Sequence, residues 1–234
     1  MLTGMPRVSA DAAVPPEPGS ELALEAHDVP AARSLAVGDD AADTLLFVAA
    51  GSGRLELADL EHPLAAGSAA LVLAGERATV TAETGGLRLV HATVGPYVDR
   101  HASLGGRDVV VTLDDADDAR ATGKRSFQVL FGPHNGSTRA TLFAGRIPPG
   151  RAPWHYHLYD EIVWVFEGPG RLHLEGSAED LGPGAAFRLH AREVHIVENA
   201  GESEMAVLGF FTPAGSPSAA YLPADGESAY GFDP

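Results

Sequence analysis

The sequence predicts an all-β protein built from two tandem barrels of short antiparallel strands. Short apolar runs recur between clusters of glycine, aspartate and proline along the chain, a pattern typical of strands separated by turns. No long segment has the 3.6-residue period of an amphipathic helix. An internal repeat indicates that one strand-rich unit has been duplicated. These three observations favour an antiparallel sandwich or barrel, including the jelly-roll forms.

The expected elements follow in chain order. Residues 1–20 contain several prolines and two glycines, so we expect an extended N-terminal arm there. We expect the first barrel at 21–115 and the second at 120–215, with a boundary between Asp114 and Lys124 and a C-terminal tail at 216–234. The strand-like runs are 45–48, 71–73, 87–90 and 109–111 in the first barrel, and 127–131, 140–143, 161–166, 171–174 and 205–211 in the second.

The internal repeat links the two halves at a constant offset. The segment "LLFVAAGSGRLEL" aligns with "IVWVFEGPGRLHL" when the first is shifted by 117 residues, which places Gly51 on Gly168. The same offset places Gly67 on Gly184 without a gap. Two separate glycine turns that keep one register indicate a duplicated domain. We interpret the glycine pairs of the second half, at 168–170 and 182–184, as hairpin turns, because no phosphate-loop Lys and Ser or Thr follow them.

Charge and composition exclude several classes of function. The chain of 234 residues is 45% hydrophobic and 21% charged, which allows an ordinary core. Its formal charge of −16 opposes nucleic acid and anionic membrane surfaces, so we expect neither as a partner. The absence of cysteine excludes disulfides, thiol nucleophiles and cysteine-ligated metals. No apolar run is long enough to span a bilayer and no secretory leader is evident, so we expect a cytoplasmic protein.

One group of residues in the second half has the chemistry of a metal site. His155 and His157 are two residues apart, so both imidazoles face the same side of an extended strand. Glu161 follows after a bend, and His195 offers a fourth donor. Three neutral imidazoles and one carboxylate suit a divalent first-row metal: Mn, Fe, Ni or Co, with Zn possible. If the four residues were unrelated, their inward polar groups would carry a large desolvation cost.

The same segment resembles the cupin family. Its first signature motif is matched by Gly150, His155, His157, Glu161 and Gly168, and the second by Gly184, His195 and Asn199. In the second motif the family usually has a proline and a glycine where this sequence has His190 and Arg192, so the turn before His195 is expected to differ in shape. We expect His190 to be a turn residue, with a proton-shuttle role at the pocket mouth as the alternative.

The resemblance implies a bicupin, with two jelly-roll (double-stranded β-helix) barrels and one metal per chain in the second, and it implies a homodimer. At the repeat offset the ligand positions become Gly38, Asp40, Thr44 and Ala78. These do not form a matching donor set, so we expect the N-terminal barrel to lack metal ligands. Five further histidines show no ligand spacing and are expected to be surface or satisfied core residues: His27, His62, His91, His101 and His134.

Aromatic residues crowd the first motif and leave two interpretations open, a substrate cavity or ordinary core and interface packing. They are Trp154, Tyr156, Tyr159, Trp164 and Phe166. Strand alternation predicts that Val163 and Val165 face the metal together with Glu161, while Trp164 and Phe166 face away.

Four protein donors leave two coordination positions open, which is typical of a catalytic site. Proteins that resemble this site are often dioxygenases, so the first hypothesis is an oxidoreductase acting on a chelated small organic molecule, with Glu161 also acting as a base. The second is a hydrolase, lyase or isomerase with the layout of ureidoglycine aminohydrolases, which keep manganese only in the C-terminal half but have glutamine where His195 stands. The third is a non-catalytic binding or sensing bicupin.

Overall fold

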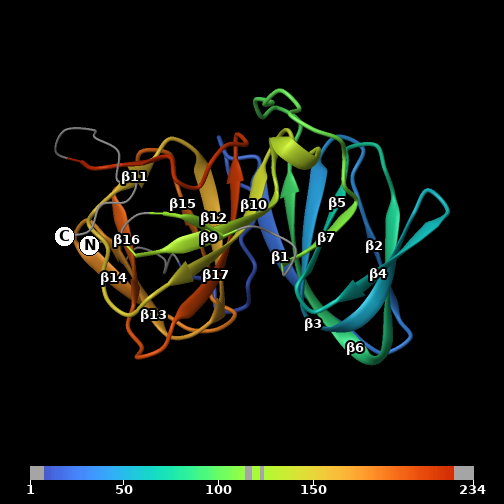
Figure 1. The fold of residues 1–234 in the computed structure, drawn as a ribbon, viewed down its shortest axis with the longest axis horizontal. Helices are drawn as coiled ribbons and strands as arrows, with labels where there is room; N and C mark the ends of the chain where they lie inside the picture. Colours follow the sequence, from blue (N-terminus) through green and yellow to red (C-terminus); the bar gives the residue numbers. More distant parts are fainter. Residues whose placement is uncertain (1–7, 114–117, 122–123, 224–234) are drawn as a thin grey trace.

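The computed structural model describes residues 8–113, 118–121 and 124–223, and these residues form strands and loops with no α-helix. No helix of this part of the chain is long and apolar enough to cross a membrane. Figure 1 shows two groups of strands side by side, the first half of the chain at the right and the second half at the left. The expectation of an all-β protein with two barrels is confirmed.

The N-terminal barrel is a single seven-stranded sheet with the order β1-β6-β3-β5-β7, in which β2 also pairs with β6 and β4 with β3. Its strands are β1 (Leu22–Val29), β2 (Ser34–Val37), β3 (Asp43–Leu57), β4 (Leu60–Ala65), β5 (Ser68–Val72), β6 (Ala78–Val94) and β7 (Val110–Thr112). The register between β3 and β6 shifts on either side of Gly51. Gly51 has φ +84°, and a Cβ there would lie 2.1 Å from the Gly86 carbonyl oxygen. Only glycine allows the two strands to approach so closely at this bend.

The C-terminal barrel divides its strands among three sheets, ordered β15-β12-β17-β10-β9-β8, β14-β13-β16 and β11-β18. The first sheet contains β8 (Asp118–Arg120), β9 (Ser126–Phe131), β10 (Thr141–Ile147), β12 (Asp160–Glu167), β15 (Ala186–Leu189) and β17 (Met205–Thr212). The others contain β11 (Tyr156–His157), β13 (Gly170–Leu174), β14 (Ser177–Leu181), β16 (His195–Asn199) and β18 (Ala220–Tyr221). A 3-10 turn, η2 (Pro133–Asn135), lies between β9 and β10.

The interpretation of the second-half glycine pairs as hairpin turns is wrong. Residues 168–170 join β12 to β13, and residues 182–184 join β14 to β15, and in both cases the two strands belong to different sheets. Gly168 and Gly184 both have positive φ. The glycines therefore make the corners at which the chain passes from one wall of the barrel to the other.

Alternating side chains divide the core into an interior for each barrel and a layer between the barrels. Leu46 and Leu89 belong to the N-terminal interior, and Val163 and Val165 to the C-terminal interior. Trp164 belongs to the layer between the barrels, and Phe166 packs against that layer and meets Phe47 edge-on at 5.8 Å. The predicted alternation along β12 is confirmed, and these two aromatics pack between barrels rather than lining a substrate cavity.

The described part of the N-terminal arm is extended and runs over both barrels. Ser9 forms an isolated bridge with Ala186 of β15, and Val14 forms one with Leu24 of β1. Arg188 of β15 donates hydrogen bonds to the Pro15 and Leu22 carbonyls. Residues 114–117 and 122–123 of the expected domain boundary lie outside the described residues, and the domain limits stay a prediction.

Candidate metal centre

Short strand pairings bring the two predicted motifs together. His157 lies on β11, whereas His155 forms an isolated antiparallel bridge with His195 at the start of β16. In that bridge the His195 N–H donates to the His155 carbonyl at 2.9 Å, and the reverse hydrogen bond is 3.2 Å. The chain bends at residues 158–159 and enters β12, whose second residue is Glu161. The expected bend and the same-side placement of the two histidines are confirmed.

The four side chains are near neighbours that line one cavity. The His155 and His195 ring centroids are 4.5 Å apart, and those of His157 and His195 are 5.0 Å apart. His157 Nε2 lies 2.9 Å from Glu161 Oε2. All four residues are buried. The structure therefore gathers every residue that the sequence singled out, and their role as metal ligands stays a prediction.

Backbone carbonyls fix the tautomer of each imidazole. Nδ1 of His155 lies 3.0 Å from the Pro153 oxygen, Nδ1 of His157 2.9 Å from the Tyr159 oxygen, and Nδ1 of His195 2.8 Å from the Glu193 oxygen. A carbonyl oxygen only accepts hydrogen bonds, so Nδ1 carries the proton in all three rings. Each Nε2 is then left with a free lone pair. Metal-ligating histidines usually have this second hydrogen bond.

The contact between His157 and Glu161 tests whether a metal fits. His157 Nε2 is buried and makes no hydrogen bond, although the carboxylate oxygen is only 2.9 Å away. With the proton on Nδ1, both atoms present lone pairs, and two buried acceptors repel each other at this distance. A cation bound by both atoms would replace this repulsion with two favourable contacts. The donor set therefore fits a divalent metal.

The surroundings keep the His155 and His195 imidazoles neutral, which is the form that binds metals. Burial, with the nearby Arg125 charge, lowers the pKa of His155 to about 4. Burial, with the neighbouring His155 and His157, holds the pKa of His195 well below its usual value. The Tyr159 ring stacks on His157 at 4.2 Å, and burial raises the pKa of its phenol.

The turn before His195 keeps a glycine-like backbone conformation at position 192, and the expected difference in its shape stays a prediction. Arg192 adopts φ +67°, the left-handed region that glycine occupies at lower cost. Its N–H donates to the His157 carbonyl at 2.7 Å, so the turn helps to hold a ligand strand. The His190 N–H donates to the Glu193 carboxylate within the turn, and its ring lies 3.2 Å from Glu17. His190 does not line the cavity beside the four side chains, as expected for a turn residue.

A cavity of about 90 Å³ adjoins the four side chains. Its walls are mainly apolar, with Phe143, Val163, Leu189 and Val207 among them. Arg125, which directly precedes β9, adds a positive charge and donates a hydrogen bond to the Val197 carbonyl. Burial lowers the pKa of Arg125 to about 10, which leaves the guanidinium charged near neutral pH.

Two parts of this site were not predicted from the sequence. Arg125 lies near the expected domain boundary, where an isolated arginine gives no periodic or motif signal. Part of the expected tail also contributes: β18 pairs with β11, and Tyr221 stacks on Tyr156 with a centroid distance of 5.7 Å. Pro217 and Ala220 line the cavity, so this described part of the tail is a wall of the site.

Comparison with known proteins places this site in a family. The family described as "Cupin domain" matches residues 145–211, the segment that contains all four converging side chains. The C-terminal barrel therefore contains a cupin domain. The match lies within the C-terminal barrel, and solved structures extend the shared fold to most of the chain.

The solved structures share the fold at low sequence identity. AerE from Microcystis aeruginosa has a TM-score of 0.70 at 14% identity and covers 83% of this chain and 88% of its own. An oxalate decarboxylase mutant from Bacillus subtilis has a TM-score of 0.72 at 12% identity and covers 88% of this chain and 72% of its own. These similarities support the two-barrel cupin fold. At this level of sequence identity they do not indicate which reaction the chain catalyses.

Curated relatives match shorter segments. An L-ectoine synthase from Bordetella petrii is 28% identical over 109 residues, which are 46% of this chain and 78% of that protein. An L-ectoine synthase from Rhodococcus opacus is 40% identical over 62 residues, which are 26% of this chain and 46% of that protein. The HTH-type transcriptional activator RhaS from Mannheimia succiniciproducens is 35% identical over 65 residues, 28% of this chain and only 24% of that protein.

The N-terminal barrel needs one correction. The offset positions do not form a donor set: Asp40, for example, pairs at the surface with Arg77. Elsewhere in that barrel, however, Glu25, His27 and His91 place three donor atoms within 4.8 Å of one another. The expectation that this barrel lacks metal ligands stays a prediction. The expectation that His27 and His91 are surface or satisfied core residues is wrong, because each has a buried ring nitrogen without a hydrogen bond.

Proposed function

We propose that the C-terminal barrel is the active site of a metal-dependent enzyme that acts on a small organic acid. One divalent metal would be held by Nε2 of His155, His157 and His195 and by the Glu161 carboxylate. The observation that carries this proposal is the Nε2 atom of His157, which is buried without a hydrogen bond 2.9 Å from a carboxylate oxygen. A bound metal would polarise an oxygen of the substrate and stabilise negative charge on it.

Manganese is the first choice among Mn, Fe, Ni, Co and Zn. Imidazole nitrogen and carboxylate oxygen are compatible with all five metals, so the donor set alone does not choose among them. The similar oxalate decarboxylase from Bacillus subtilis has Mn(II) centres. With four protein donors on a metal that prefers six, two positions remain for substrate or water.

Arg125 suggests the substrate class. Its guanidinium lies in a largely apolar wall that also includes Arg146, which pairs with Glu204, and a desolvated arginine pairs best with a carboxylate. A substrate carboxylate on Arg125 would orient the rest of the molecule towards the four ligands, while Val163, Leu189 and Val207 contact its apolar part. Glu161 would accept a proton from the substrate, because its carboxylate already faces the point of convergence.

Two reaction classes remain, each favoured by a specific observation. A non-oxidative reaction, of the synthase, lyase or hydrolase kind, is favoured by the L-ectoine synthase from Bordetella petrii, of which the match covers 78%. An oxidoreductase of the dioxygenase kind is the second candidate, favoured by a donor set that leaves room for both substrate and dioxygen. The match to RhaS covers only 24% of that protein and gives little support to a sensing role.

The test of reaction class uses the full-length protein loaded with Mn²⁺ and a panel of small mono- and dicarboxylic acids. Products are followed by mass spectrometry and dioxygen by an oxygen electrode. Turnover without dioxygen uptake supports the non-oxidative class, and stoichiometric uptake supports the oxidoreductase. If no acid is converted with Mn or with any of the other four metals, the proposed enzyme is wrong.

The role of Arg125 is tested by Arg125→Gln, with Arg171→Gln as control because Arg171 pairs with Asp180 at the surface. Loss of a charge-assisted hydrogen bond of about 1.5–3 kcal/mol should raise KM by about 10- to 100-fold, while metal content stays unchanged. An unchanged KM would reject the carboxylate assignment, and a loss of metal would show that Arg125 supports the ligands instead.

A cytoplasmic homodimer without nucleic-acid or membrane partners stays a prediction.

A further inference from the structure

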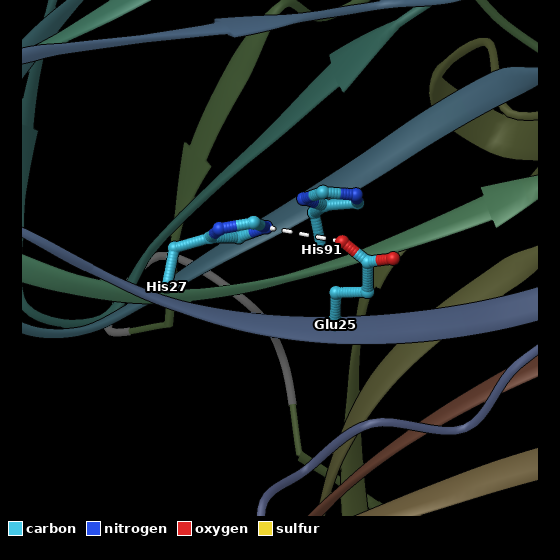
Figure 2. A group of neighbouring side chains, drawn as sticks. All are labelled: Glu25, His27 and His91. Carbon is cyan, nitrogen blue, oxygen red and sulfur yellow. Dashed lines mark ion pairs between the residues drawn. The ribbon is translucent and has the colours of Figure 1, made fainter.

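We propose that the N-terminal barrel holds a second metal-binding site, formed by Glu25, His27 and His91, which takes a Zn²⁺-like divalent cation. Figure 2 shows the three side chains gathered on neighbouring strands, with the His27 and His91 rings stacked and the Glu25 carboxylate beside them. The ring centroids are 4.8 Å apart, and His27 Nε2 lies 3.6 Å from Glu25 Oε2. This inference is independent of the proposed function.

Strand register places the cluster on the inner face of the barrel. Glu25 of β1 is paired with His91 of β6, and His91 is paired on its other side with Leu46 of β3. Directly paired residues point to the same face of a sheet, and Leu46 belongs to the barrel interior. His27 lies two residues beyond Glu25 and therefore faces the same side.

Buried polar atoms without partners indicate that a ligand belongs here. Nε2 of His27 and Nδ1 of His91 are both buried and make no hydrogen bond. Thr44 Oγ1, also buried without a hydrogen-bond partner, lies on the same face, because Thr44 is two residues from Leu46 on β3. Buried polar atoms normally find partners, so three orphan atoms on one face call for an explanation. A cation bound by both imidazoles would supply it for the two nitrogen atoms.

The two barrels differ at this place in an informative way. The repeat aligns Leu46 with Val163, and Val163 pairs with Gly209, which in turn pairs with Phe143. His91 therefore occupies the position of Gly209, and Glu25 that of Phe143. Phe143 lines the cavity of the C-terminal barrel, so the cluster occupies the counterpart of that cavity, beside the counterpart of the ligand Glu161. The candidate donors of the N-terminal barrel therefore lie at other strand positions than the four residues of the C-terminal barrel.

The chemistry suits zinc better than a hard cation. Two imidazoles and one carboxylate are a donor set that Zn²⁺ accepts while one position stays open, whereas Ca²⁺ and Mg²⁺ prefer oxygen ligands. β1 is an edge strand of its sheet, and Glu25 is exposed, so an ion can enter from solvent. The stacked rings must turn about their terminal torsions to aim both lone pairs at one ion, and such torsions are broad.

The experiment measures Zn²⁺ binding to the full-length protein by equilibrium dialysis with elemental analysis. His91→Gln should remove one equivalent relative to the wild-type chain. Glu25→Gln changes an exposed residue and should weaken the same equivalent by at least about 10-fold, since even loss of an outer-shell partner costs about 10- to 100-fold. His134→Gln and Glu61→Gln, which alter exposed residues of matching type outside the cluster, should leave binding unchanged.

A second readout keeps the test valid if His91→Gln fails to fold. In nitrogen-15 NMR spectra of the wild-type histidine rings, Zn²⁺ should shift two signals from this cluster. Glu25→Gln should make these two signals less sensitive to Zn²⁺, whereas His134→Gln should leave their response unchanged. The proposal is overturned if His91→Gln folds and binds as many equivalents as the wild type. It is equally overturned if the Zn²⁺ titration of Glu25→Gln, by dialysis and by NMR, matches that of the wild type.

Discussion

A single methyl group added at position 209 should damage the proposed metal centre without touching any ligand. Gly209 lies on β17, paired with Val163 on one side and Phe143 on the other. A Cβ at this position would lie 2.1 Å from Phe143 Cε1 and 2.6 Å from Glu161 Oε1. Real contacts of a Cβ are longer than 3.0 Å, so both the ring and the carboxylate must move.

The size of the effect follows from these distances. Forcing an extra carbon into a packed interior costs about 1–3 kcal/mol, which for a chain of this length lowers Tm by about 2–12 °C. The Glu161 oxygen must retreat by about 0.4 Å or more, which exceeds the tolerance of about 0.2 Å for metal–ligand distances. Metal affinity should therefore fall at least as far as it does when an outer-shell partner is lost, by about 10- to 100-fold.

The assay compares Gly209→Ala with Gly182→Ala by metal titration and thermal unfolding of the apo and metal-loaded proteins. Gly182 has no atom within 4 Å of a built Cβ and no positive φ, so its substitution should change stability by less than about 0.5 kcal/mol. Equal metal affinity in the two variants would refute the claim that the space beside Gly209 positions Glu161.

Two further predictions concern stability. Removing the metal with a chelator should lower the free energy of unfolding by about 2.7 kcal/mol relative to protein with free metal at about 100 times Kd. In calorimetry, His157→Ala should abolish most of this difference between the apo and metal-loaded proteins. If that variant keeps the full metal-dependent difference, the ligand assignment is contradicted. Arg192→Gly should raise the free energy of unfolding by up to about 1 kcal/mol, because glycine adopts φ +67° without strain, although it also makes the unfolded chain more flexible. A lower urea midpoint in this variant would show that contacts of the Arg192 side chain stabilise the fold by more than its backbone conformation costs.

Local patterns carried most of what the sequence could predict. Residues 155–161 lie on neighbouring short strands, so spacing alone predicted which side chains would meet. The alternation of Val163 and Trp164 between barrel interior and inter-barrel layer also follows from the two-residue period of a strand. His195 was offered as a fourth donor by its chemistry and then matched the second cupin-like motif, but no spacing argument placed it beside the other three.

What the sequence did not predict depends on long-range pairing. Glu25 and His91 are distant in the chain, and only the register between β1 and β6 brings them together. The pairing of β18 with β11 and the approach of Arg125 to the cavity likewise depend on how the chain crosses the barrel. The glycines at 168–170 have the composition of a hairpin turn, and whether the next strand returns to the same sheet is decided by tertiary packing.

The central claim is that His155, His157, Glu161 and His195 bind one metal ion, and anomalous diffraction from a crystal of the Mn²⁺-loaded protein tests it most directly. The account predicts an anomalous peak bound by Nε2 of all three histidines and by a Glu161 oxygen, at about 2.0–2.3 Å, with each Nδ1 still facing its backbone carbonyl. Fully loaded crystals without a peak among these four residues, and with His157 Nε2 still facing the Glu161 carboxylate, would contradict it.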